Sequence, residues 1–274
     1  MTPGYLAHFG LETQPFTKEI PDSELWLPSS KAAVVDELLE AVNARESLVL
    51  VGEPGVGKTC VLRGLRHRLP QANFRLTYCH NATLGRRDFY RQLSLALGLT
   101  PNATAASVFF AVSKHVEDLG REKQHPVFLL DEAHLLHQDT LDHLHILLNY
   151  QWDSKALLSL ILVGLPELDD RLAARRNRSL YSRLSRRLFV SALSPDDTGE
   201  YLRLRLSRAG CDRELFASDA VAMLHEAANG ALRDVDRLAA ASLREAARKK
   251  KKLVEREVLA RVLDAEGIRP GEES

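Results

Sequence analysis

Residues 52–59 have the types and the spacing needed to hold the phosphates of a nucleotide. They read GEPGVGKT and fit the pattern G-x-x-x-x-G-K-[ST] at every position. Glycines let backbone N–H groups turn toward phosphate oxygens, and a helix that begins here adds the partial positive charge of its N-terminus. Lys58 would reach the outer phosphates, and the Thr59 hydroxyl would ligate Mg²⁺. The predicted nucleotide-binding residues are Gly52, Glu53, Pro54, Gly55, Val56, Gly57, Lys58, Thr59 and Cys60.

A second group with catalytic chemistry lies further along the chain, where an apolar run ends in two carboxylates. Residues 127–132 read VFLLDE, a pattern typical of a buried strand. Asp131 would hold Mg²⁺ directly or through water, and Glu132 would orient or deprotonate the water that attacks the γ-phosphate. A strand that merely ends in solvated acids is the alternative, but the complete phosphate loop favours hydrolysis. Lys58 and Glu132 are therefore predicted to be catalytic.

Strand and helix patterns alternate around these two motifs. Strands are expected at 47–51, 74–79, 127–131 and 157–164, and helices at 59–69, 86–97 and 105–119. This alternation predicts an α/β fold with a mainly parallel sheet covered on both faces. After Ser194 only helices are expected, with stop signals at Gly210 and Gly230 and an N-cap at Ser218. An α/β P-loop core followed by a small all-helical lid is the architecture of AAA+ ATPases.

Composition restricts the cellular setting. The chain has 274 residues, 45% of them hydrophobic, and 37 basic residues balance 37 acidic ones, so the total charge gives no sign of a polyanion partner. Cys60, Cys79 and Cys211 lack the paired spacing of a zinc site or a disulfide framework. No apolar run reaches the ~18 residues of a membrane span, and no signal peptide is evident. These features favour a cytoplasmic protein without a membrane partner.

Motifs along nearly the whole chain resemble the ExeA-type ATPases and their transposition relatives of the TniB and TnsC kind. The similar segments are YLAHFGLETQPF (5–16), GEPGVGKT (52–59), LLDEAHLL (129–136), LVGLPELDDRL (162–172), SRLSRRLFVSALSP (182–195), YLRLRLSRAG (201–210) and GALRDVDRLAAASLREA (230–246). The resemblance implies ATP and Mg²⁺ as cofactors, bound between the subunits of a hexameric ring or a helical filament. It divides the chain into an N-terminal extension near the nucleotide (1–30), an ATPase core (31–193), a lid (194–267) and a flexible tail (268–274).

The same resemblance assigns roles to two arginines. Arg183, at an arginine-rich helix end before a strand FVSAL (189–193), matches the finger offered to the γ-phosphate of the neighbouring subunit, with Arg186 and Arg187 as rivals. Arg233 matches the sensor-2 arginine of the lid, with a surface arginine as the alternative.

One position departs from the pattern of the relatives. They usually carry a polar residue after the glycine that ends the fourth strand, whereas Leu165 stands here. Since a leucine cannot hydrogen-bond a phosphate or a water, either another group replaces it or hydrolysis is slow.

Basic residues point to possible partners. In the TnsC-like relatives the segment after the second strand faces the bore and follows the DNA backbone, which implies non-specific contacts of duplex DNA with Arg86, Arg87, Arg91 and Lys114. Seven arginines without an acid lie between Arg171 and Arg187, and residues 248–252 are all basic. Contact with nucleotide or a partner subunit is the alternative for the first run, and a solvated helix end for the second.

Other polar and aromatic residues receive ordinary roles. The histidines after the second motif lack a clean metal-binding pattern and are expected on helix surfaces. Three aromatic residues near the N-terminus are expected to close the adenine side or the edge of the core. The histidines are His134, His137, His143 and His145. The aromatic residues are Phe9, Phe16 and Trp26.

Three functions are compatible with these features. The first is an ATP-dependent regulator of DNA transposition that oligomerises on duplex DNA, recruits a transposase and target-selection proteins, and is remodelled by hydrolysis. The second is an ExeA-like secretion ATPase; such proteins usually continue into a membrane helix and a peptidoglycan-binding part, and the end of this chain at Ser274 favours transposition. The third is a scaffold that binds ATP without hydrolysing it.

Overall fold

The computed structural model describes residues 4–79, 85–99, 105–150 and 154–268. The chain forms two compact units. Residues 29–53 and 58–190 form the sheet unit, and residues 1–28, 54–57 and 191–274 form the helical unit, as far as each is described. Each unit has its own hydrophobic core.

The sheet unit is built on five parallel strands in the order β2-β3-β4-β1-β5. Their bounds are β1 Ser47–Val51, β2 Phe74–Cys79, β3 His125–Leu130, β4 Ser159–Gly164 and β5 Leu184–Phe189. The three strands β1, β3 and β4 are buried along their whole length, which explains their nearly continuous apolar sequences. The predicted parallel sheet is thus confirmed.

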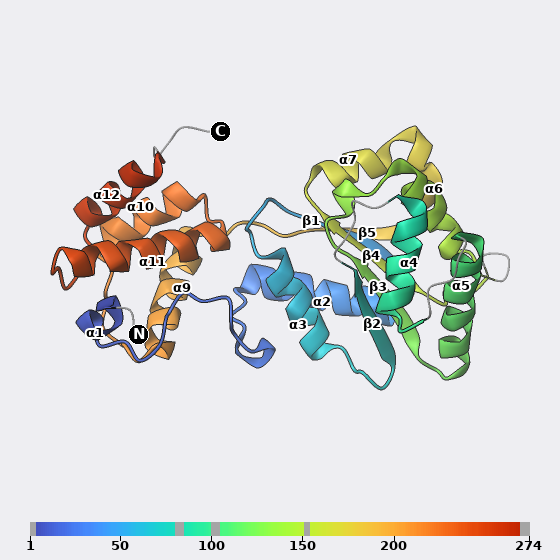
Figure 1. Ribbon diagram of the computed structural model, residues 1–274, viewed down its shortest axis with the longest axis horizontal. Helices are drawn as coiled ribbons and strands as arrows, with labels where there is room; N and C mark the ends of the chain where they lie inside the picture. Colours follow the sequence, from blue (N-terminus) through green and yellow to red (C-terminus); the bar gives the residue numbers. More distant parts are fainter. Residues whose placement is uncertain (1–3, 80–84, 100–104, 151–153, 269–274) are drawn as a thin grey trace. The chain divides into compact units, whose positions relative to one another are not determined.

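Helices cover both faces of this sheet (Figure 1). The helices α2 and α3 lie on one face, and the others pack on the other face around apolar residues of β1, β3 and β4. The bounds are α2 Ser29–Asn43, α3 Lys58–Arg68, α4 Arg86–Ala96, α5 Ala105–Arg121, α6 Gln138–Leu147, α7 Glu167–Ala173 and α8 Arg178–Tyr181, with the short 3₁₀ turns η2 Ala133–Leu135 and η3 Arg175–Asn177.

The helical unit combines the C-terminal helices with the N-terminal segment. Its elements are α1 Gly4–Phe9, η1 Asp22–Glu24, α9 Pro195–Arg208, α10 Ser218–Ala228, α11 Leu232–Arg248 and α12 Arg256–Glu266. The start of α9 is fixed by a capping box, in which the Ser194 hydroxyl accepts from the Asp197 N–H and the Asp197 carboxylate accepts from the Ser194 N–H. Leu6, Phe9 and Leu11 are buried in the same core as the C-terminal helices. The fold predicted after Ser194, a small helical lid, is confirmed.

Two local predictions were wrong. The last strand is β5, not residues 189–193, so that Arg186 and Arg187 lie within a strand and not at a helix end. Only Leu184 and Leu188 of β5 are buried, because β5 is an edge strand paired with β1 alone, and its two arginines hid the strand pattern. In α10 the N-cap is Ala217, and Ser218 is the first helical residue.

Candidate nucleotide-binding site

The phosphate loop joins β1 to α3 through residues 52–57. Gly55 and Gly57 have φ angles of +78° and +103°, in the left-handed region that glycine adopts without steric cost. Since α3 begins directly after this loop, its first free N–H groups face the same space. The loop therefore has the backbone shape of an anion cradle.

Lys58 and the residues after it occupy the first turn of α3. The Lys58 ammonium donates to the carbonyl oxygens of Gly52 at 2.7 Å and Glu53 at 3.0 Å, which holds its charge over the loop. Thr59 is exposed and Cys60 is half-buried. A hydroxyl at the start of this helix suits a hard cation such as Mg²⁺.

The two carboxylates follow β3 without a break. Asp131 is 8% exposed, and both of its oxygens accept hydrogen bonds: Oδ1 from the Glu132 N–H at 2.9 Å and Oδ2 from the Tyr78 hydroxyl at 2.7 Å. Glu132 has a left-handed backbone (φ 54°, ψ 35°), and its side chain is half exposed. Asp131 is therefore a fixed carboxylate and Glu132 an accessible one, as a metal ligand and a base require.

Tyr78 was missed by the sequence analysis. In the β2–β3 pairing Tyr78 lies opposite Leu129, so it reaches the carboxyl edge of the sheet together with Asp131. Burial, and then the hydrogen bond to Asp131, raises the pKa of Tyr78, so the hydroxyl stays a donor at neutral pH. The rule that carboxyl ends of neighbouring parallel strands meet at one edge could have found it.

The end of β4 lies against the turn that follows the carboxylates. A Cβ on Gly164 would come within 2.9 Å of Leu168 Cδ2 and 3.2 Å of His134 Nδ1, so a larger residue would require these side chains to shift. The Nε2 atom of His134 is 3.6 Å from Glu132 Oε2. The expectation of a helix-surface position was wrong for His134, because its side chain is only 10% exposed and its imidazole lies beside the predicted base. It is next to the position where Leu165 offers no polar group.

The three candidates for the arginine finger differ in their surroundings. Arg183 lies in the turn before β5, where its Nη1 donates to the Ser179 carbonyl oxygen at 2.9 Å. Arg186 forms ion pairs with Glu40 at 3.0 Å and Glu46 at 2.6 Å. The Arg187 guanidinium lies 3.9 Å from the centre of the Tyr181 ring and 3.4 Å from Asp169. Because Arg186 already serves two carboxylates, Arg183 stays the predicted finger.

The sensor-2 candidate Arg233 is the second residue of α11 in the helical unit, which includes residues 54–57. Its backbone N–H donates to the Gly55 carbonyl oxygen at 3.2 Å. A Cβ on Gly55 would lie 3.3 Å from Arg233 Cβ. The main chain of Arg233 thus borders the phosphate loop, and the contact of its guanidinium with phosphate stays a prediction.

The residues predicted to contact DNA lie on α4 and α5. Arg86 donates from Nη1 to His143 Nε2 at 2.6 Å, and burial followed by the nearby charge of Arg86 lowers the pKa of His143. Arg87, Arg91 and Lys114 are exposed. The segment predicted to contact DNA covers residues 81–93, and its residues 81–84 lie outside the described residues. The same holds for residues 269–274 of the predicted tail.

The N-terminal aromatic residues belong to the helical unit. Phe9 is 2% exposed, and Phe16 and Trp26 pack against the same core. The Trp26 Nε1 donates to Glu200 at 3.0 Å. Their predicted place beside adenine is not tested by these contacts.

Known proteins resemble this chain in sequence and in fold. Residues 42–172 match a family model described as an AAA domain. The solved structure of Cdc6p from Pyrobaculum aerophilum has a TM-score of 0.68 and 17% identity, covering 88% of this chain and 67% of that one. The protein has the AAA+ P-loop fold. The AAA+ folds of ORC from Drosophila (TM-score 0.71, 19% identity, 97% of this chain and 67% of that one) and of RuvB from Thermotoga maritima (0.60, 16%, 92% and 73%) are also similar.

A curated relative also matches nearly the whole length of this chain. General secretion pathway protein A of Aeromonas hydrophila is 29% identical over 269 residues, which cover 97% of this chain and 49% of the relative. The chain therefore spans about half the length of that relative. Among the described residues, no helix is both long and apolar enough to cross a membrane.

Proposed function

We propose that this protein is an ATP-dependent, DNA-binding AAA+ regulator of DNA transposition. With ATP it assembles on duplex DNA in the cytoplasm as a ring or filament and recruits a transposase and target-selection proteins, and hydrolysis then remodels the assembly. The observation that carries the nucleotide part is the carboxyl edge of the sheet, where the fixed Asp131 and the accessible Glu132 follow one strand.

The residues of this edge fit ATP with Mg²⁺. The phosphate loop and Lys58 bind the phosphates, while the Thr59 hydroxyl and the Asp131 carboxylate are the oxygen donors that Mg²⁺ prefers. The metal would supply charge neutralisation on the phosphates. Glu132 orients the attacking water and accepts its proton, and Arg183 of a neighbouring subunit stabilises the charge on the γ-phosphate.

Exposed cations on α4 and α5 support the DNA contact. Arg87, Arg91 and Lys114 are exposed to solvent, and such side chains bind phosphates without reading sequence. Two proteins of similar fold have been solved in complex with DNA, ORC of Drosophila and ORC1 of Aeropyrum pernix.

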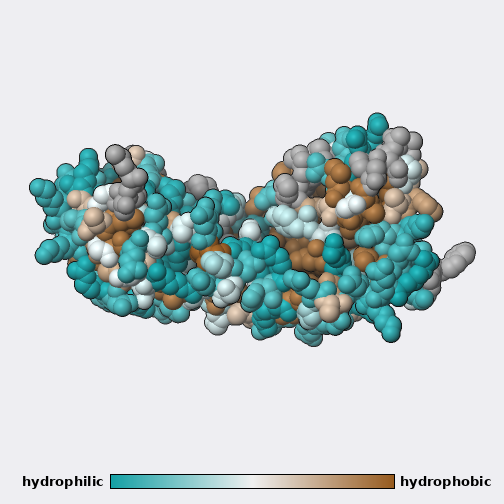
Figure 2. Space-filling view, turned by 60° about the horizontal axis from the view of Figure 1, so that its bottom comes forward, coloured by the Kyte–Doolittle hydropathy of each residue, from teal (hydrophilic) through white to brown (hydrophobic). Residues whose placement is uncertain are grey.

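Exposed apolar side chains on the sheet unit support assembly into an oligomer. Figure 2 shows hydrophobic patches on the surface of this unit. The exposed large hydrophobic residues described all belong to it: Tyr78, Leu95, Phe110, Leu135, Ile146 and Phe189. Surfaces of this kind commonly mark contacts with other protein molecules.

A secretion ATPase is the second candidate, and the match to General secretion pathway protein A is the observation that favours it. In that function the same AAA+ site would hydrolyse ATP without duplex DNA as a partner. The two candidates therefore differ in their response to DNA.

Binding of fluorescent duplex DNA by the purified protein tests the proposal. We expect tight, salt-sensitive binding with ATP or a slowly hydrolysed analogue, and weak binding with ADP or no nucleotide. Lys58→Ala should abolish the nucleotide effect, whereas Lys155→Ala, which removes an exposed lysine elsewhere on the sheet unit, should not.

The outcomes separate the candidate functions. Absent binding, or binding indifferent to nucleotide, would reject the DNA-bound switch and favour secretion. ATP turnover is measured in parallel. Absence of ATP turnover in the wild type, at the same background level as in Glu132→Gln, would favour the scaffold that does not hydrolyse ATP.

A further inference from the structure

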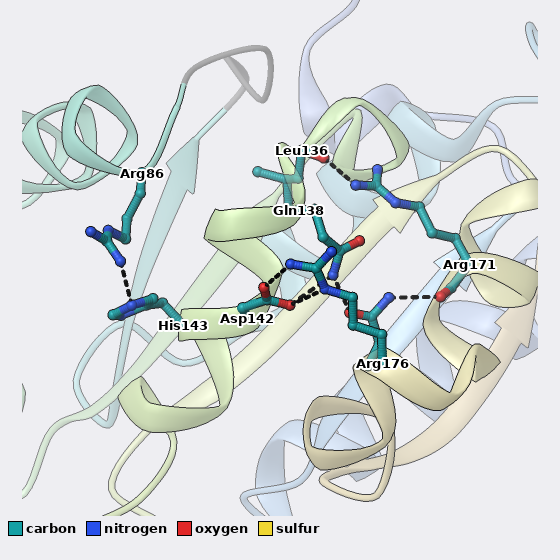
Figure 3. A network of polar contacts seen from close by, with 8 residues as sticks. Arg86, Leu136, Gln138, Asp142, His143, Arg171 and Arg176 are labelled. Atoms are coloured by element: carbon teal, nitrogen blue, oxygen red, sulfur yellow. Dashed lines mark hydrogen bonds and ion pairs between the residues drawn. The ribbon is translucent and has the colours of Figure 1, made fainter.

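A half-buried arginine of α7 clamps the turn that follows the two carboxylates (Figure 3). The Nη1 atom of Arg171 donates to the His134 carbonyl oxygen at 2.8 Å, and its Nη2 donates to the Leu136 carbonyl oxygen at 2.6 Å. A planar guanidinium with two parallel donors suits two such acceptors in a way that a lysine ammonium does not. Arg171 therefore fixes the main chain of η2 by a two-point contact.

The clamped turn begins at the predicted base. A left-handed backbone at a residue with a Cβ, as at Glu132, is strained and persists only where the surroundings hold it. The Leu135 N–H donates to the Glu132 carbonyl oxygen at 2.9 Å, and Arg171 holds the residues on both sides of that donor. The direction of the Glu132 carboxylate thus depends on a turn that Arg171 stabilises.

The main chain of Arg171 is tied to the segment that leads to the predicted finger. The buried Asn177 donates from Nδ2 to the Arg171 carbonyl oxygen at 2.8 Å and accepts at Oδ1 from Gln138 Nε2 at 2.6 Å. Asn177 ends η3 and is the N-cap residue of α8, which precedes Arg183. Arg171 therefore contacts both segments. Its side chain binds the turn at η2, and its carbonyl group accepts from Asn177.

A charged residue of α6 supports the contact between Gln138 and Asn177. Asp142 accepts from Gln138 at 2.8 Å and forms an ion pair with Arg176 at 2.6 Å. Hydrogen bonds from Arg176 and Gln138 lower the pKa of Asp142, so it is ionised at neutral pH. Figure 3 shows these side chains between the Arg171 clamp and His143, which binds Arg86 on α4.

We propose that Arg171 is a positioning residue for two catalytic groups, Glu132 of its own subunit and Arg183 offered to the neighbouring subunit. The inference rests on the proposed function, because it requires ATP hydrolysis between subunits. A purely structural arginine would lower the stability of the subunit without acting on both groups.

Mixed oligomers separate the two roles. Glu132→Gln subunits keep the finger and lose the base, and Arg183→Ala subunits keep the base and lose the finger. Each alone should be inactive, and mixing should restore turnover where an intact Arg183 meets an intact Glu132. Arg171→Lys is then added to one type of subunit at a time, so that it affects either the finger or the base of the restored site.

We expect Arg171→Lys to lower the restored turnover at least about fivefold in both placements, because small misplacements of catalytic groups cost this much or more. Affinity for a fluorescent ATP analogue should stay within about twofold, since the phosphate loop is untouched. Arg175→Lys is the matched control, because Arg175 is an exposed arginine of η3. Gln138→Ala, which removes the support of Asn177, should give the same pattern and replaces Arg171→Lys if that variant does not fold.

Two results would overturn the inference. Control-level turnover in either placement contradicts a role for Arg171 at both groups, while the proposed ATPase stands if the wild type hydrolyses ATP. Wild-type protein without turnover, with or without DNA, overturns the proposed hydrolysis and the inference with it.

Discussion

The hydroxyl of Tyr78 donates a hydrogen bond of 2.7 Å to Oδ2 of Asp131, at the carboxyl edge of two neighbouring strands. The other oxygen of Asp131 accepts from the Glu132 N–H. The predicted metal ligand is thus oriented from both sides. Hydrogen bonds to a ligating carboxylate of this kind commonly tune metal affinity.

Tyr78→Phe should weaken the Mg²⁺ dependence of ATP turnover. We expect the Mg²⁺ concentration at half-maximal rate to rise about tenfold, because Asp131 loses one of the two bonds that orient it. Titration of Mg²⁺ at saturating ATP measures this. Tyr5→Phe, in the helical unit, is the control, and equal Mg²⁺ dependence of Tyr78→Phe and wild type would show that the bond does not serve the metal.

Arg87→Gln/Arg91→Gln should reduce the salt dependence of DNA binding. Each lost phosphate contact reduces the magnitude of the negative slope of log K against log salt by about 0.9. The slope of the double variant should therefore be smaller in magnitude by about 2. Arg86→Gln should have a smaller effect, because Arg86 already donates to His143. Binding is measured across salt with Arg203→Gln, an exposed arginine of α9, as the control. Unchanged slopes in the double variant would place the DNA surface elsewhere.

Arg205→Ala should destabilise the helical unit by about 3 kcal/mol, because buried hydrogen-bond acceptors lose their charged donor. Arg205 is 4% exposed and donates to the Pro15 and Thr17 carbonyl oxygens, at 2.6 and 2.8 Å, and to the Tyr201 hydroxyl at 2.7 Å. Urea unfolding followed by circular dichroism measures the loss. Arg203→Ala should change stability by less than about 0.5 kcal/mol. Similar losses in both variants would contradict a specific role for the buried arginine.

His125 should make the sheet unit less stable as the pH falls from 6.5 to 4. Burial lowers the pKa of His125 from 6.5 to about 4, and its Nε2 forms a 2.9 Å hydrogen bond with Ser159. Between these values the unfolded chain binds a proton that the folded chain does not, so stability rises with pH.

We therefore expect the difference in unfolding free energy between pH 7 and pH 5 to be about 1–2 kcal/mol smaller in His125→Gln than in wild type. His67→Gln, in which an exposed histidine of α3 is replaced, should behave as wild type. The same pH dependence in His125→Gln and wild type would show that this histidine is not the source.

Elements with strong local patterns were predictable from sequence. The bounds of β1 and β2 agree with the expectation to the residue, because short runs rich in residues that favour strands lie between turn residues. The strand β5 was misplaced because it combines two buried leucines with two adjacent arginines, and only its pairing with β1 shows that it is a strand.

The parts of the site that depend on one continuous motif were likewise visible in the sequence. The phosphate loop and the pair Asp131 and Glu132 belong to such motifs. Tyr78 and Arg171 were missed because their partners come from other elements, β3 and η2, and no local spacing encodes a bond between side chains or carbonyl groups that distant in the chain.

The helical unit is assembled from the first and the last parts of the described chain, and this order affects folding during synthesis. Leu6, Phe9 and Leu11 leave the ribosome before the sheet unit, but α9–α12, which bury them, follow that unit. The sheet unit can form while these apolar residues still lack their partners. A nascent chain therefore exposes a hydrophobic segment until α9–α12 have been synthesised, which makes it a substrate for chaperones that bind such segments.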